Sequence, residues 1–224
     1  AKRLGNAIVR PEPGRVTDDN TGIWRFMLAS NADVTLGDLT GRVAPLVIGW
    51  VMGPAMAGLF AVAQRATVIL AQPAQILGNA SYAELAHIVA GGYGGRALRQ
   101  TLLKVVGIAV LAAVPVVLIV GIFPTQIIRL MAGPAFGAAS GVMIALVAAR
   151  AVALIGPPCT SALTALGHPA RSMWANLLSS FAFLPLLPWL LTTFGLMGAG
   201  IQAVAQAVVA NGLLAVLVWR TSGR

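Results

Sequence analysis

The chain has 224 residues, of which 58% are hydrophobic and only 9% are charged, and its mean hydropathy is +0.86. A soluble domain carries about 25% charged residues, so this chain has too few charges to cover a surface that faces water, and we expect lipid to be its solvent. The net charge of +9 is, in so apolar a chain, typical of basic residues at cytoplasmic membrane ends. We therefore expect no nucleic-acid partner.

Residues 1–22 are rich in charged residues and proline, and we predict a solvated cytoplasmic segment next to the membrane. The chain begins at Ala1 and shows no signal-peptide pattern, so we expect a fragment whose N-terminal half is missing. The single cysteine, Cys159, lies in an apolar run. It can form no intramolecular disulfide, and we predict neither a metal site nor a cofactor.

Residues 23–220 predict an all-α, polytopic membrane protein with a bundle of six transmembrane helices. A span needs about 20 apolar residues, and Gly53-Pro54 provides the turn between the first two. The fourth helix either ends before Pro157 and Pro158 or continues past them with a kink. We expect the six helices at residues 24–52, 55–83, 102–122, 135–155, 171–191 and 196–219.

Two shorter stretches lie between these spans. Residues 127–136 are too few to cross a bilayer and predict a short interfacial helix before the fourth span. The glycine-rich residues 89–96 superficially suggest a phosphate-binding loop. They lack the Gly-Lys-Ser/Thr ending and follow no strand, so we interpret them as a cytoplasmic loop.

Successive connections between the expected spans are alternately rich and poor in lysine and arginine. Because basic connections face the cytoplasm, we expect both ends of the chain there. All five tryptophans fall near expected span ends, where aromatic belts lie at the membrane interface. The sequence therefore predicts a multi-pass protein with membrane lipid around it.

The order of the spans and of four motifs resembles the C-terminal half of the polysaccharide flippases. These proteins export lipid-linked oligosaccharides and belong to a superfamily that also holds the multidrug MATE exporters. The resemblance covers nearly all of residues 24–219, with one departure at Ala44, where many relatives carry aspartate. The motifs comprise Gly58, Leu59, Phe60 and Ala63; Ile127, Ile128, Leu130, Gly133 and Phe136; residues 162–167; and Gly195, Gly198 and Gly200.

The resemblance implies twelve or more helices in two similar bundles around a central cavity, of which this chain supplies one. It implies alternating access and a substrate of undecaprenyl-diphosphate-linked oligosaccharide, moved across the bacterial cytoplasmic membrane for cell-surface polysaccharide. The partners would be this anionic lipid and the missing N-terminal half. No nucleotide site is visible in the sequence, so an ion gradient would drive transport.

Charged residues inside the expected spans are the candidate site, because an ionisable group there is costly and usually faces a cavity or a partner. Asp38 and Arg42 are spaced i,i+4 and so lie on one helix face. They either only neutralise each other or have a role in transport. Arg65 shares a helix face with Gln72. Arg150 has apolar neighbours. Its side chain either faces a cavity or extends along the helix toward the cytoplasmic membrane surface.

Gln202 and Gln206 form a polar patch on the last helix, which either lines a wet cavity or links helices by hydrogen bonds. We expect Arg42, Arg65 and Arg150, with Gln72, Gln202 and Gln206, to bind the substrate. Arginine makes bidentate contacts with phosphate. Asp38 and Asp33 are candidates for ion coupling.

Three alternatives remain open. An ion-coupled MATE-type drug exporter would take organic cations, which a basic cavity repels. A membrane enzyme would need acid/base groups or metal ligands, and His87 and His168 each stand alone, with Glu84 the nearest acid. We therefore expect no enzyme. A non-transporting membrane subunit is the third alternative.

Overall fold

A computed structural model describes residues 42–68 and 94–222, together with residues 76, 82, 84, 85, 87–89 and 91. All regular structure in these residues is helical, and they contain no strand. The all-α class is therefore confirmed for this part of the chain. The expected segment 1–22 and most of the first expected helix lie outside the described residues.

Three helical stretches are long and apolar enough to cross a membrane: Gly95–Ile122, Pro134–Ala165 and Leu196–Thr221. A fourth is possible if the helices Pro169–Phe183 and Leu186–Phe194, bent by 46° where they meet, form one broken span. The chain is thus a membrane-embedded helical protein. Within the described residues it has three spans, or four with the bent pair, so the six expected from the sequence are not all present there.

The turn predicted at Gly53-Pro54 is confirmed. The helix Arg42–Met52 ends at Gly53, whose φ of 91° lies in the region that favours glycine, and Pro54 opens α3 (Pro54–Ala66). Thr67 closes α3, because its hydroxyl donates to the Gln64 carbonyl at 2.7 Å. The second expected helix, 55–83, is therefore continuous to Ala66, and most of its remainder lies outside the described residues.

The next helix begins earlier than expected. α5 (Gly94–Ile122) includes a basic first part that the apolar pattern alone assigned to a loop at residues 94–101. It is followed by α6 (Pro124–Ala132), which confirms the short helix predicted near residue 127, and by the 3-10 helix η1 (Pro134–Ala139). Leu130 of α6 is 90% exposed, as expected for an apolar side chain that meets lipid at an interface.

The second long stretch, Pro134–Ala165, is broken after Ala153. α7 (Ser140–Ala153) and α8 (Gly156–Ala165) are separated at Leu154 and Ile155. The expected disturbance at Pro157 and Pro158 occurs just before them, because a proline has no N–H to donate and disfavours helix at the preceding residue.

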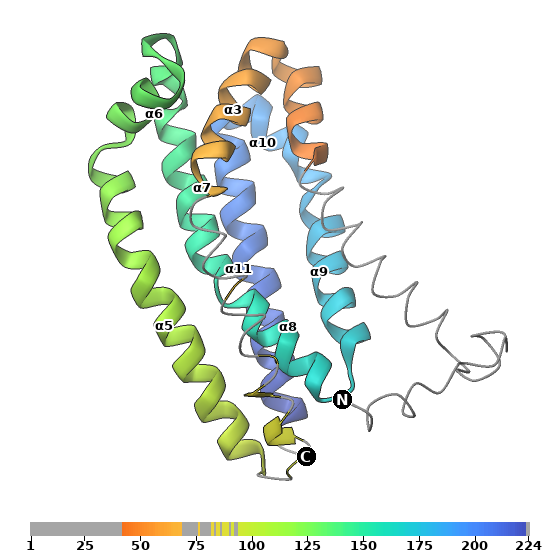
Figure 1. Cartoon of the computed structure of the whole chain (residues 1–224). Helices are drawn as coiled ribbons and strands as arrows, with labels where there is room; N and C mark the ends of the chain where they lie inside the picture. Colours follow the sequence, from red (N-terminus) through yellow and green to blue (C-terminus); the bar gives the residue numbers. More distant parts are fainter. Residues whose placement is uncertain are drawn as a thin grey trace, which may run out of the picture.

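α9 (Pro169–Phe183) and α10 (Leu186–Phe194) divide the fifth expected helix at Pro185, and α11 (Leu196–Thr221) matches the sixth closely. α11 packs against α7, α8, α9 and α10 and so lies at the centre of the described bundle (Figure 1). Its first turns contain two glycines that allow close approach. A Cβ on Gly200 would lie 2.5 Å from the Ala145 Cβ on α7, and one on Gly198 would collide with the Leu190 carbonyl on α10.

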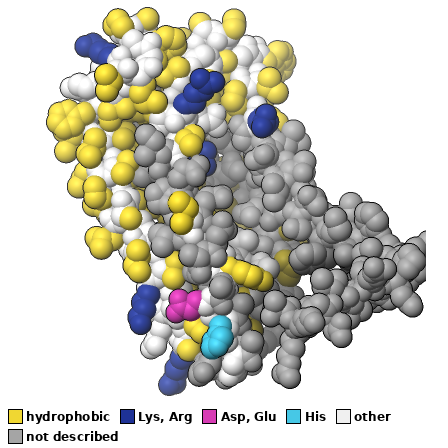
Figure 2. Space-filling view, viewed as in Figure 1, with side chains coloured by type: hydrophobic (Ala, Val, Ile, Leu, Met, Phe, Trp, Pro, Cys, Tyr) yellow, Lys and Arg dark blue, Asp and Glu magenta, His cyan; other side chains and the backbone are white. Residues whose placement is uncertain are grey.

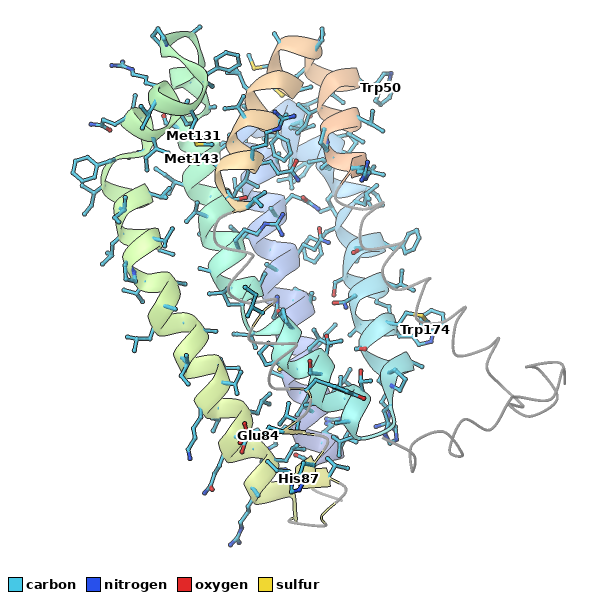
Figure 3. The ribbon with its side chains drawn as sticks, in the orientation of Figure 1. Trp50, Glu84, His87, Met131, Met143 and Trp174 are labelled. Carbon is cyan, nitrogen blue, oxygen red and sulfur yellow. The ribbon has the colours of Figure 1, made fainter. Side chains whose placement is uncertain are left out.

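Large apolar side chains cover the outside of the bundle, as Figure 2 shows. Trp50 lies at the end of the bundle that contains the Gly53 turn, and Trp174 lies on α9 toward the opposite end of the bundle (Figure 3). Trp50, Trp174, Trp189 and Trp219 are all more than half exposed. This surface is consistent with lipid as the solvent, because soluble proteins rarely expose so extensive an apolar surface to water.

Candidate functional site in the membrane interior

Arg150 lies in the middle of a membrane-spanning stretch. It is on the last turn of α7, midway along Pro134–Ala165, and its side chain is half-buried. Its guanidinium makes no hydrogen bond or ion pair with another residue that the structure describes. The structure thus places Arg150 within a helical stretch that is long and apolar enough to cross a membrane; its depth in the bilayer stays a prediction.

Local geometry explains why α7 tolerates Arg150. The helix ends at Ala153, three residues later, where its last carbonyls begin to lose their helical donors. A cation on the last turn of a helix interacts favourably with these carbonyls, by about 0.3–1 kcal/mol. Placing arginine at the bilayer centre costs about 2.5–3.5 kcal/mol on insertion scales. The helix end therefore offsets only a part of this cost.

Arg65 and Arg42 have different surroundings. Arg65 is exposed on the last turn of α3, and Arg42 is exposed at the first described residue of its helix. α3 packs against α7, so Arg65 and Arg150 belong to neighbouring helices. A common site for the three arginines stays a prediction. Gln72, Asp33 and Asp38, the other candidates on the first two expected helices, lie outside the described residues.

Gln202 and Gln206 are brought together as their spacing predicted. The Gln202 amide Nε2 donates to the Gln206 Oε1 at 2.9 Å, and the Gln206 Nε2 donates to the Ser180 hydroxyl on α9 at 3.1 Å. Gln202 is only 7% exposed. This hydrogen-bonded chain links α11 to α9, so of the two roles left open by the sequence the geometry favours the helix-linking one.

Asn211 is a polar residue that the sequence reasoning missed. It is 7% exposed, its Nδ2 donates to the Ala207 carbonyl at 2.7 Å, and its Oδ1 would be 2.8 Å from a Cβ built on Gly156. Asn211 thus packs against the start of α8, on the far side of α11 from Gln202. A lone asparagine in an apolar helix is the signal that predicts such an interior position.

The two histidines considered for an enzyme lie in different parts of the chain, His87 before α5 and His168 before α9. The His168 Nδ1 lies 2.7 Å from the Leu166 carbonyl oxygen in the turn before α9. His87 lies near Glu84 at the end of the bundle where α5 begins (Figure 3). The described residues contain no group of three or more His, Cys, Asp or Glu that could hold a metal ion.

Arg99 was not a predicted site residue, yet it makes the most contacts of the arginines described. Its Nε donates to the Ser222 hydroxyl and its Nη2 to the Trp219 carbonyl, both at 2.8 Å, and its guanidinium lies 4.3 Å from the Trp219 ring centroid. These partners are more than 100 residues away in the chain, so no local sequence pattern predicts the contacts.

Comparison with protein-family models, with curated proteins and with solved structures finds no match to this chain. The polysaccharide-flippase resemblance therefore rests on the residues and motifs of the sequence itself. What the structure adds is a membrane-embedded helical bundle that holds one arginine, without a partner among the described residues, in the middle of a span.

Proposed function

We propose that this chain forms one bundle of a transporter that flips undecaprenyl-diphosphate-linked oligosaccharide across the bacterial cytoplasmic membrane for cell-surface polysaccharide synthesis. The observation that carries the proposal is Arg150, half-buried at mid-span with no partner among the described residues. The rest of the bundle, including a second set of helices, would complete the cavity.

The free-energy balance at Arg150 supports a ligand. The helix end supplies about 0.3–1 kcal/mol against an insertion cost of about 2.5–3.5 kcal/mol, which leaves roughly 2 kcal/mol that no described residue offsets. A diphosphate group is the kind of partner that offsets such a cost, because guanidinium binds phosphate oxygens in a bidentate, charge-assisted geometry. An intramembrane charge of this kind is, by default, a functional residue.

The charge balance favours an anionic substrate over the organic cations of a drug exporter. Glu84 is the only acidic residue among those described, while basic residues occur on the helix Arg42–Met52 and on α3, α5, α6, α7, α9 and α11. A cation pathway would need carboxylates at membrane depth, and the two candidates, Asp33 and Asp38, lie outside the described residues. The MATE-type alternative therefore lacks support in this part of the chain.

Orientation follows from where the basic residues gather. Arg96, Arg99, Arg171 and Arg220 all belong to the end of the bundle where α5 and α9 begin and α11 ends. Under the positive-inside rule this end would face the cytoplasm. The C-terminus would then be cytoplasmic, and the Gly53 turn and α6 would face the other side.

The test replaces Arg150 in the gene for the whole protein in its native cells. We expect Arg150→Ala to reduce surface polysaccharide at least tenfold and to raise the amount of its lipid-linked precursor, because one charge-assisted contact to phosphate contributes about 1.5–3 kcal/mol. Arg150→Lys keeps the charge but not the planar fork and should retain part of the activity. Extracted surface polysaccharide and precursor lipid are the two quantities to measure.

Arg129→Ala is the matched control, because Arg129 is exposed on the short helix α6 rather than inside a span. It should leave both quantities unchanged. Immunoblots of the membrane fraction must show equal amounts of each variant. Normal polysaccharide in Arg150→Ala would refute the proposal, and a change in drug resistance alone would favour the exporter alternative.

A further inference from the structure

The end of the bundle where α5 and α9 begin and α11 ends carries four arginines from three helices. We call it the basic end and define it by Arg96, Arg99, Arg171 and Arg220. Hydrogen bonds join it together, because Arg99 contacts Trp219 and Ser222, and the Arg171 Nη1 donates to the Thr221 hydroxyl at 3.0 Å. The last turn of α11 is therefore held between α5 and α9, and Figure 1 shows the end of α11 near the start of α5.

Most donors of the basic end remain unused by the protein. A guanidinium has five N–H donors; Arg99 uses two of them and Arg171 uses one. Arg96 and Arg220 are exposed and make no hydrogen bond or ion pair with another described residue. Glu84, at the same end, is the one described acid (Figures 2 and 3), so the positive charge there is largely uncompensated by described residues.

The backbone adds to this positive potential. α5 and α9 both begin at the basic end, so the positive ends of their helix dipoles lie there, and in the first turn of α9 the Arg171 N–H donates to the His168 carbonyl at 3.1 Å. The dipole of a helix favours anions near its N-terminus. On the other side, Arg99 already satisfies the Trp219 carbonyl at the end of α11, which reduces the opposing negative potential.

The surroundings distinguish a lipid headgroup from a soluble anion. Trp219 is 55% exposed and Trp174, one turn from Arg171, is 59% exposed, which is the arrangement of an aromatic belt at the level of lipid headgroups. Leu178, one turn beyond Trp174 on α9, and Val216, one turn before Trp219 on α11, are exposed as well. A ligand at the basic end would thus have guanidinium groups for its phosphate and apolar side chains for its acyl chains.

We infer that the basic end is a binding site for the headgroup of a resident acidic phospholipid, with Arg96, Arg171 and Arg220 contacting the phosphate. Arg99 serves as a positioning residue that fixes α11 against α5. The site is separate from Arg150, which lies at mid-span, and it does not depend on the transported substrate. Basic clusters between helices on the cytoplasmic side are the type of surface that binds such headgroups.

The experiment uses the full chain in nanodiscs of phosphatidylcholine, with Trp219 as the only tryptophan after the other four are replaced by phenylalanine. Brominated phosphatidylglycerol or brominated phosphatidylcholine is added, and quenching of Trp219 fluorescence reports which lipid lies beside it. We expect half-maximal quenching at a mole fraction at least fivefold lower for the glycerol lipid, because each basic residue near an anionic headgroup contributes about a fivefold preference.

The variant Arg96→Gln/Arg220→Gln removes two charges that have no described protein partner, so folding should be unaffected. It is expected to abolish most of the preference, while Arg129→Gln on α6, far from the basic end, should preserve it within twofold. The double lysine variant, Arg96→Lys/Arg220→Lys, should restore most of it. Circular dichroism of each variant must show the same helix content.

Three results would overturn the inference. The first is equal quenching by the two brominated lipids, and the second is an unchanged preference in the double glutamine variant. The third is loss of the preference on adding inorganic phosphate, but not on adding chloride of the same ionic strength, because the site would then take a soluble anion rather than a headgroup. None of these results bears on Arg150, so failure here is distinguishable from failure of the proposed transport function.

Discussion

Arg99 and Arg150 belong to the same bundle but have opposite surroundings. Arg99, near the start of α5, donates two hydrogen bonds to the end of α11 and stacks on Trp219. Arg150, at the middle of a span, has no partner among the described residues. The comparison separates two settings of arginine in this bundle: Arg99 links two helices near their ends, whereas Arg150 has no such link among the described residues, and we propose that it binds a ligand.

The largest expected loss of stability comes from adding a single methyl group where the start of α5 meets the end of α11. Gly95→Ala would drive a Cβ into the Ser222 carbonyl, which is backbone and cannot move aside. We expect a loss of about 3 kcal/mol in stability, measured as the unfolding free energy in detergent. Gly107→Ala on the same helix meets nothing within 4 Å and should be neutral or stabilising by up to about 1 kcal/mol. Equal effects of the two changes would contradict the described docking of α11 on α5.

Removing Arg99 tests the same region through its side chain. Arg99→Ala deletes two hydrogen bonds and a cation–π contact, and we expect a loss of about 2 kcal/mol. Arg96→Ala, one turn away and exposed without a described partner, should change stability by less than about 0.5 kcal/mol. Thermal unfolding followed by size-exclusion fluorescence measures both. If Arg96→Ala is as damaging as Arg99→Ala, the contacts of Arg99 are not what stabilises this end.

Replacing Arg150 should increase the stability of the protein rather than reduce it. Because its charge is half-buried without a described partner, Arg150→Gln is expected to raise the unfolding free energy by about 1 kcal/mol in the absence of substrate. The same thermal assay measures this change. A clear loss of stability would mean that Arg150 has a structural partner, and its place in the comparison would then be wrong.

The smallest effect concerns the polar link between α11 and α9. Ser180→Ala and Gln206→Leu each break the 3.1 Å hydrogen bond between these side chains. Their double-mutant cycle should give a coupling of about 0.6 kcal/mol, the average for hydrogen bonds between membrane helices. Ser140→Ala, at the start of α7, supplies a pair with Gln206→Leu that should show no coupling. Zero coupling between Ser180 and Gln206 would leave the wet-cavity interpretation of Gln206 standing.

Local patterns predicted much of this bundle. The Gly53-Pro54 turn, the short helix near residue 127 and the bounds of α11 all follow from punctuation by Gly and Pro and from apolar length. The early start of α5 did not, because arginines that look like a loop extend the helix to reach the end of α11. The six-span count stays a prediction, because most of the first two expected helices lies outside the described residues; the other four expected helices correspond to the three spans and the bent pair.

The position of Arg150 along its helix could be predicted from the sequence, whereas its role stays a prediction. Arg150 is visible as a lone charge in an apolar run, and its mid-span position follows from counting residues. Its lack of a described partner is a fact of three-dimensional packing, as are the contacts of Arg99 across more than 100 residues. The roles of Gln202 and Gln206 were balanced in the sequence, and only the position of Ser180 on α9 favours a link over a cavity.

The most direct test of the central claim is the affinity of the purified protein, in phosphatidylcholine nanodiscs, for undecaprenyl diphosphate. We expect Arg150→Gln to raise the Kd at least tenfold, corresponding to about 1.4 kcal/mol, while Arg129→Gln leaves it unchanged. An Arg150→Gln protein that binds undecaprenyl diphosphate as tightly as the unaltered chain would contradict the account.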